Sequence, residues 1–232
     1  MADDNKALKY TRYAIGEITL VVIGILIALS INNWNESQKE KRTLLSTYAI
    51  VAKDLKNDIN DINDILQYYE SIKPCYEKIL DGKMTKEDYI KNKECSRILM
   101  NYPDFSIDLR GYNLISNNLK SDTDSLTIDI VQFYSKTTLE IELNEKSKNI
   151  NFNNNYIYWQ NNSSWFSSFI LGRDKTNLNE EFIEYSINSQ DYKNRVALFY
   201  LINYQVLSIQ YEEFKVNAEI LVKRIEEFNS QM

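Results

Sequence analysis

One continuous apolar stretch dominates the hydrophobic pattern near the start of the chain. Residues 13–34, YAIGEITLVVIGILIALSINNW, carry a single charge, at Glu17, and the stretch Ile18–Ile31 is almost entirely aliphatic. A helix of this length rises ~33 Å, which matches the ~30 Å hydrocarbon core of a bilayer. Tyr13 and Trp34 stand at its two ends, where amphipathic rings favour the headgroup region. The pattern therefore predicts a transmembrane helix.

Two other interpretations of this stretch stay open. A soluble core helix is rarely apolar on every side over such a length. A cleaved signal peptide is the closer alternative, because Lys6, Lys9 and Arg12 form a basic start and Ala28-Leu29-Ser30 has the small-x-small form of a cleavage site. Glu17 inside the hydrophobic entry, and the helical pattern that continues beyond this point, favour an uncleaved anchor.

Beyond the apolar stretch, apolar side chains recur at alternating spacings of three and four residues, which indicates one stripe along a helix. The stripe consists of Leu45, Tyr48, Ala52, Leu55, Ile59, Ile62, Leu66 and Tyr69. Charged residues lie between its members, among them Asp54 and Asp58, and we assign them to the solvated side. We expect the helix to leave the membrane and end at Lys73, before Pro74.

The rest of the chain predicts further helices separated by polar turns. Asp81-Gly82-Lys83 is the clearest turn, and Ser121–Asp124 offers caps for a longer helix, in which the Asn-rich stretch Asn149–Ser164 is a candidate break. A final helix starts near Ser189 and carries a second apolar stripe from Tyr200 to Phe228. We therefore predict an all-α fold, in which the transmembrane helix continues into a long helix and is followed by an extramembrane helical bundle.

These elements divide the chain into four parts. They are a short cytoplasmic tail (1–12), the transmembrane helix (13–34), a membrane-proximal amphipathic helix (35–73) and the remainder of the bundle (74–232). Basic residues flank both ends of the membrane segment in near balance, so the orientation rests on the short tail. An uncleaved signal anchor usually keeps such a tail inside. We expect a single-pass inner-membrane protein with a periplasmic C-terminal domain.

Composition removes several classes of function. The 232 residues include no His, two Pro and five Gly, and the formal net charge is -6. Without imidazole, the chain forms no Ser-His-Asp triad, Cys-His dyad or His-based zinc site. The acidic balance argues against a nucleic-acid partner. We therefore predict a protein that is not an enzyme and that has no catalytic residue, no cofactor and no metal site.

Four residues of the membrane segment are candidates for helix–helix packing. Gly24 and Ala28 form a small-xxx-small pair that lets another helix approach closely, and Glu17 and Asn32 lie on nearly the same face. The alternative for Glu17 is a carboxylate near the interface, favoured by the helix dipole. Through this face we expect a homo-oligomer or contact with another membrane protein, and the lipid bilayer is itself a partner.

Two other sets of residues are candidates for stability or binding. Cys75 and Cys95 flank the turn at Gly82, and a disulfide or two buried thiols both stay open because helix registers are uncertain by a few residues. Aromatic and amide side chains gather after Asn153, which is the chemistry of a sugar-stacking surface, although aromatics at helical spacing are more often core. The candidate ligand surface consists of Tyr156, Trp159 and Trp165.

The run KYTRYAIGEITLVVIGILIALSINNWNE, residues 9–36, resembles the N-terminal signature of an uncharacterised group of Bacteroidota membrane proteins, domain of unknown function 6090. Residues 111–115, GYNLI, and 130–135, IVQFYS, are similar to weaker blocks of the same group. The resemblance implies a membrane-anchored protein. It implies no known activity and no catalytic residue.

Three functions agree with these features. The first is a non-enzymatic, membrane-anchored helical interaction or scaffold protein that self-associates. The second is a membrane-tethered ligand- or glycan-binding domain, which requires a concave aromatic pocket near Trp159 and Trp165. The third is an oligomeric pore lined by Glu17, Gly24 and Asn32.

Overall fold

The computed structural model describes residues 4–117, 119, 124–172 and 179–230, with side chains from Tyr13 onward. Within these residues every regular element is a helix, so the predicted all-α class is confirmed. Residues 1–3 of the predicted tail and 121–123 of the predicted helix cap lie outside the described residues. The chain divides into two compact units, Met1–Ala49 and Ile50–Met232.

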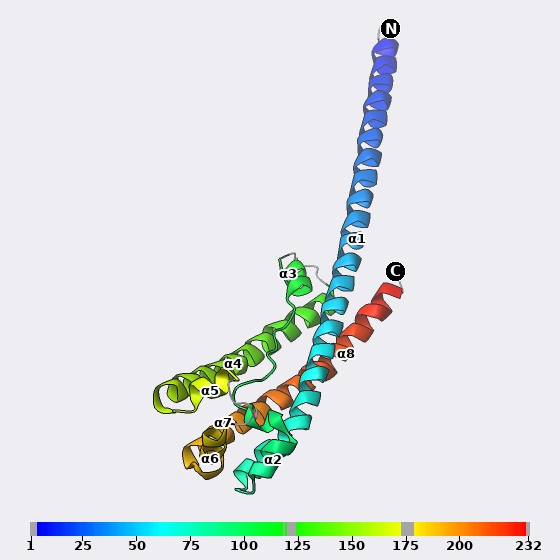
Figure 1. Ribbon diagram of the computed structural model, residues 1–232. Coiled ribbons are helices and arrows are strands. Elements are labelled where there is room, and N and C mark those ends of the chain that lie inside the picture. Colours follow the sequence, from blue (N-terminus) through cyan, green and yellow to red (C-terminus); the bar gives the residue numbers. More distant parts are fainter. Residues whose placement is uncertain (1–3, 118, 120–123, 173–178, 231–232) are drawn as a thin grey trace. The chain divides into compact units, whose positions relative to one another are not determined.

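Helix α1, Asp4–Leu80, belongs to both units (Figure 1). We predicted that it ends at Lys73, but the helix continues through Pro74. The proline removes one backbone donor, a loss of about 1 kcal/mol for the hydrogen bond alone, whereas each fully buried apolar side chain contributes ~1.5–3 kcal/mol. The residues that follow the proline are buried in the bundle core, namely Cys75, Tyr76 and Ile79. These side chains reach the core only if the chain stays helical beyond Pro74, so their burial outweighs the lost hydrogen bond.

The turn that ends α1 is confirmed. Gly82 has a φ of +68°, in the left-handed region that favours glycine. The amide of Lys83 donates to the carbonyl of Lys78 at 2.8 Å, and the amide of Gly82 donates to Ile79 at 3.0 Å. This pair of hydrogen bonds is a Schellman motif, which satisfies the last carbonyls of the helix.

Two short helices follow the turn. Helix α2, Lys86–Lys91, begins after Thr85, whose hydroxyl accepts from the amide of Asp88 in a capping box. Asn92 ends α2 in an extended conformation and caps the 3-10 helix η1, Lys93–Ser96. The backbone amide of Asn92 therefore ends one helix, and its side chain starts the next.

Helix α3, Arg110–Ser116, is short, and α4, Ser125–Asn162, is long. The Asn-rich stretch Asn149–Ser164 does not interrupt α4, which ends only at Asn162. Its amides bond back along the helix: Nδ2 of Asn151 donates to the carbonyl of Ser147 at 2.8 Å. Such side chains add hydrogen bonds without displacing the backbone ones, so the helix persists.

The C-terminal part of the chain is a series of helices, α5 (Phe166–Ile170), α6 (Glu180–Asn188), α7 (Gln190–Tyr200), the π-helix η2 (Leu201–Leu207) and α8 (Ser208–Ser230). The predicted start near Ser189 is confirmed, since its hydroxyl accepts from the amide of Tyr192 at 3.3 Å. The predicted stripe is buried along α8, as Tyr211, Phe214, Ala218, Leu221 and Ile225. The π-turn was not predicted.

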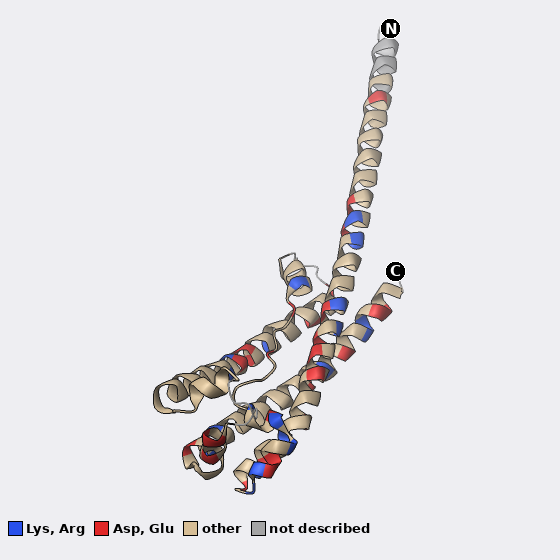
Figure 2. Cartoon of the chain, viewed as in Figure 1, with Lys and Arg blue, Asp and Glu red and all other residues tan. Residues whose placement is uncertain are grey.

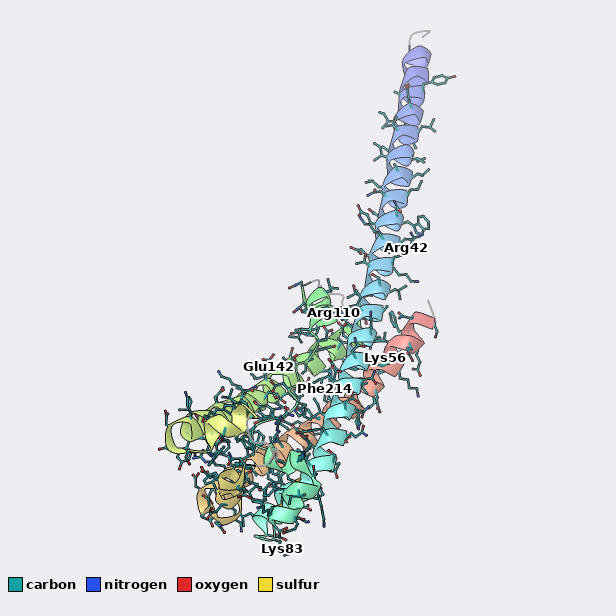
Figure 3. The ribbon with its side chains drawn as sticks, in the orientation of Figure 1. Arg42, Lys56, Lys83, Arg110, Glu142 and Phe214 are labelled. Carbon is teal, nitrogen blue, oxygen red and sulfur yellow. A yellow bond between two sulfur atoms is a disulfide. The ribbon has the colours of Figure 1, made fainter. Side chains whose placement is uncertain are left out.

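The bundle core lies between α1, α4 and the C-terminal helices. Nζ of Lys56 on α1 lies 2.6 Å from Oε1 of Glu226 on α8, and the Tyr69 hydroxyl donates to Asn203 of η2 at 3.1 Å. The rings of Phe133 on α4 and Phe214 on α8, the latter labelled in Figure 3, have centroids 5.0 Å apart. The predicted packing of the C-terminal helix against the membrane-proximal one is confirmed.

Candidate functional site

The apolar stretch of α1 is exposed on all sides. Every residue from Tyr13 to Glu36 is exposed. The sequence has no Asp, Glu, Lys or Arg between Glu17 and Glu36, so this part of α1 is coloured tan in Figure 2. Among the described residues α1 is long and apolar enough to cross a membrane, and no part of its apolar window is buried inside the protein. Water solvates such a surface poorly, so this stretch is compatible with a membrane anchor.

The four predicted packing residues lie on one face of this stretch, because successive members are seven, four and four residues apart. They are Glu17, Gly24, Ala28 and Asn32. A Cβ added at Gly24 meets no atom within 4 Å, so the surface there is open. Nδ2 of Asn32 donates to Oε1 of Glu36 at 3.2 Å, one turn further on. Glu17 and Ala28 are exposed.

Two carboxylates of α1 are buried where we expected solvent. Asp54 is 0% exposed and Asp58 is 2% exposed, which corrects their assignment to the solvated side. The buried face of α1 continues through Leu55, Asp58 and Ile62 in steps of three and four. Asp58 therefore occupies the position that the pattern had given to Ile59.

Both carboxylates bind the start of α3. Asp54 accepts from the amide of Gly111 at 2.8 Å and from Nη2 of Arg110 at 2.8 Å. Asp58 accepts from the amide of Asp108 at 3.1 Å. Arg110, labelled in Figure 3, also pairs with the Asp108 carboxylate at 2.7 Å. We call these five residues the α1–α3 latch.

The latch holds more negative than positive charge. Burial raises the pKa of Asp54 despite the hydrogen bond from Gly111, and burial raises the pKa of Asp58 to about 7. Hydrogen bonds from Arg110 lower the pKa of Asp108. Arg110 is shared by Asp54 and Asp108, whereas Asp58 is buried beside their negative charges, so Asp58 changes its protonation near neutral pH.

Gly111 allows α3 to touch the backbone of α1. A Cβ at this position would lie 2.6 Å from Cγ2 of Val51 and 2.8 Å from its Cα and N. Neither backbone atom can move without displacing α1. Only glycine fits this close approach, because it has no Cβ. The approach in turn brings the Gly111 amide within reach of Asp54.

Replacing Gly111 by Ala lowers the free energy of unfolding by about 2 kcal/mol, although Ala ordinarily favours a helix by about 1 kcal/mol over Gly. The reason is the clash with Val51. Chemical denaturation of the detergent-solubilised chain, followed by Trp fluorescence, measures the effect. Ser116→Ala in the same helix is the control and stays within about 0.5 kcal/mol of the unchanged protein. A Gly111→Ala variant as stable as the control would contradict the close approach.

Contacts of Tyr112, the residue after the latch, join α3 to α4. The rings of Tyr112 and Tyr134 stack with centroids 5.2 Å apart, and the hydroxyls of Tyr112 and Ser135 lie 3.3 Å apart. The Tyr134 hydroxyl is buried and has no hydrogen-bond partner in the described part of the chain. Helix α3 thus connects α1 to α4.

A second buried polar group lies between α4 and α8. Lys148 is 0% exposed, and its Nζ lies 2.7 Å from Oε2 of Glu145 and donates to the carbonyl of Pro103 at 2.9 Å. The Tyr211 hydroxyl donates to Glu145, and Nζ of Lys148 lies 4.8 Å from the ring centroid of Tyr102. Burial raises the pKa of Glu145, which the charge of Lys148 opposes.

A disulfide joins Cys75 of α1 to Cys95 of η1. Both residues are buried, and their Cα atoms lie 5.3 Å apart. The bond closes a loop that contains α2 and its turn. For a loop of this length a disulfide contributes ~3 kcal/mol.

The candidate ligand surface does not form as a surface. Trp159 is 0% exposed and Trp165 is 4% exposed, and both pack in the core with centroids 5.7 Å apart. Tyr156 is half-buried and packs against Phe166. A hollow of about 550 Å³ adjoins Trp165, with Tyr158 among its other lining residues. Burial leaves Trp159 and Trp165 no free face on which a sugar could stack.

The described residues hold no group of three or more Cys, Asp or Glu side chains that could bind a metal ion.

The sequence did not predict the latch, because the charges of Asp54 and Asp58 alone suggested that both residues face solvent. One signal was available in the sequence: Asp58 continues the spacing from Leu55 to Ile62 as well as Ile59 does. Nothing in the sequence indicated which segment would bind these carboxylates.

The comparisons with known proteins bear on the first part of the chain. The model of a family described as "Family of unknown function (DUF6090)" matches residues 17–137. No curated protein and no solved structure matches the chain. The matched residues contain the apolar stretch from Glu17 on, both cysteines and the whole latch.

Proposed function

The chain belongs to the DUF6090 family, whose function is unknown, and from this premise we propose that it is a membrane-anchored helical scaffold protein that self-associates and is not an enzyme. The observation that carries the proposal is the exposed apolar stretch of α1. Ten Ile, Leu and Val residues lie between Ile18 and Ile31. At ~0.3–0.6 kcal/mol each near the bilayer centre, they favour insertion by ~3–6 kcal/mol.

The rest of the chain supplies a rigid body for such an anchor. The polar groups buried in the latch and around Lys148 bind one another, which orders the helices. The disulfide suits an oxidising compartment. We place the protein in the inner membrane of a bacterium of the Bacteroidota, with its tail inside and residues 36–232 in the periplasm.

Self-association uses the face of Glu17, Gly24, Ala28 and Asn32. An open surface at Gly24 lets two helix backbones approach, and van der Waals packing then stabilises the pair in lipid. Polar side chains on the same face can bond across the pair. The partner lies in the membrane and is a second copy of the chain.

Cross-linking of native membranes tests this proposal. We expect the full-length chain to stay with the membrane after alkaline extraction and to give adducts of two or more copies. Gly24→Leu reduces the adducts about tenfold, because the larger side chain separates the helices. Val22→Leu, on the opposite face, is the matched control and leaves them unchanged. A chain released by alkali, or adducts insensitive to Gly24→Leu, would count against the proposal.

A further inference from the structure

Helix α3 is attached to the bundle mainly through polar contacts. Its buried residues are Gly111, which carries no side chain, and Ile115. The segment before α3 forms no helix or strand, and the burial of Phe105 and Ile107 anchors it on the core. A short element with so little buried apolar surface can open without unfolding the rest of the chain. The α1–α3 latch is therefore the main attachment of α3 to α1.

Asp58 is the least compensated carboxylate of the latch. It is 2% exposed, and in the described part of the chain it accepts from a single donor. That donor is the amide of Asp108, which lies 3.1 Å from Oδ1 and 3.3 Å from Oδ2 of Asp58. A carboxylate has room for about four donors, so water solvates an ionised Asp58 better once the latch is open.

The charges nearest to Asp58 on α1 and at the start of α3 make ionisation in the closed latch harder still. Burial raises the pKa of Asp58 most, and three negative neighbours raise it further, namely Asp108, Asp54 and Asp61. The guanidinium of Arg110 pairs with Asp54 at 2.8 Å and with Asp108 at 2.7 Å. This cation is therefore bound to the neighbours of Asp58 and not to Asp58 itself.

Two other helices pack on this part of α1. On α4, burial and then the charge of Asp58 raise the pKa of the Tyr134 hydroxyl, which donates to no group in the residues that the structure describes. On α8, Glu226 is paired with Lys56 at the surface. Neither contact gives Asp58 a positive partner. The closed latch thus favours the protonated form of Asp58, and an open latch favours the ionised form.

From this arrangement we propose that the α1–α3 latch responds to pH: α3 stays on α1 in acid, and near neutral pH it is released while the rest of the bundle stays folded. Release begins after Ile107. It uncovers Val51 on α1 and Tyr134 on α4, which Gly111 and Tyr112 cover and which are 0% exposed while α3 is in place. The inference does not depend on the proposed self-association.

The size of the response follows from proton linkage. The pKa of Asp58 is about 7 while the carboxyl is buried, and 3.8 is the ordinary value that it regains in water. Between these two values each pH unit multiplies the opening constant of the latch by about ten. The opening constant therefore rises about a thousandfold from pH 4 to pH 7. It is constant below this interval, where both forms are protonated, and above it, where both are ionised.

Hydrogen–deuterium exchange of the full-length chain in detergent tests the proposal. Peptides that cover α3 are followed by mass spectrometry from pH 4 to pH 8, with labelling times scaled to remove the intrinsic pH dependence of amide exchange. We expect the opening constant of α3 to rise about a thousandfold up to pH 7 and then to level off. We also expect it to exceed that of the α4 core around Ile141 at every pH.

Two variants connect the response to Asp58. Asp58→Asn has a side chain of the same size that does not ionise, so we expect the exchange of α3 to lose its pH dependence. At pH 8 this variant opens about a hundredfold less often than the unchanged protein. Asp61→Asn, exposed and one turn away on α1, is the matched control and keeps most of the rise.

Three results would overturn the proposal. An opening constant of α3 that does not vary with pH excludes linkage to Asp58. The same rise in Asp58→Asn assigns the response to another group. Equal opening constants for α3 and the α4 core at every pH show that the latch opens only when the whole bundle unfolds.

Discussion

Replacing Asp58 by Asn raises the free energy of unfolding by about 3 kcal/mol at pH 8 and leaves it nearly unchanged at pH 4. In the folded protein burial raises the pKa of this carboxyl from 3.8 to about 7. That difference corresponds to roughly 4 kcal/mol, and an amide, which accepts less strongly from the Asp108 amide than a carboxylate does, recovers somewhat less. The negative charges of Asp54, Asp61 and Asp108 act in the same direction as burial.

The sign of the pH dependence follows from the raised pKa. Below pH 4 the Asp58 carboxyl is neutral in both the folded and the unfolded chain, so its contribution to stability is fully present. Between pH 4 and pH 7 this carboxyl ionises in the unfolded chain but stays protonated in the folded protein, so that stability is lost progressively; above pH 7 the folded protein ionises it as well and no more is lost. The difference between Asp58→Asn and the unchanged protein therefore grows between pH 4 and pH 7 and is constant above.

Denaturant unfolding at several pH values, in the same detergent, measures the difference. Asp61→Asn, one turn further along α1 and exposed, is the matched control, and we expect it to change stability by no more than about 0.5 kcal/mol. A difference that does not vary with pH would show that folding does not raise the pKa of Asp58. An Asp58→Asn variant less stable than the unchanged protein at pH 8 would show that the latch needs this charge.

Replacing Lys148 by Met has the opposite effect and lowers the free energy of unfolding by about 3–5 kcal/mol at pH 8. Met fills a similar volume, but Glu145 loses the cation 2.7 Å away and stays buried. The carbonyl of Pro103 also loses its donor. The deficit shrinks at low pH, because a protonated Glu145 needs no cation.

The matched control is Lys146→Met, an exposed lysine half a turn away, whose effect we expect within about 0.5 kcal/mol. The double variant Lys148→Met with Glu145→Gln recovers most of the loss, since it removes the unpaired charge. Denaturation curves of the unchanged protein, the single variants Lys148→Met and Glu145→Gln, and the double variant form a double-mutant cycle. Equal losses in the single and the double variant would exclude the charge pair as the cause.

Local sequence patterns were enough to predict the features that depend on one segment of the chain. The apolar stretch is defined by its own composition, because no arrangement of ten aliphatic residues within fourteen can hide them on one side of a helix. The turn at Gly82 and the stripe along α8 are likewise local, since a left-handed glycine and a helical period act within a few residues. The all-α class followed from such segments.

The features that depend on distant partners were decided by tertiary structure. Asp54 is buried because Gly111 and Arg110 supply its donors, and Asp58 is buried because the amide of Asp108 donates to it; the donors lie 50 to 57 residues away in the sequence. Helix α1 continues past Pro74 because the residues beyond it reach the core. In the sequence, a charged residue or a proline indicates only the conformation and surroundings that it prefers in water. When a distant part of the chain replaces that water, the new contacts reverse the preference.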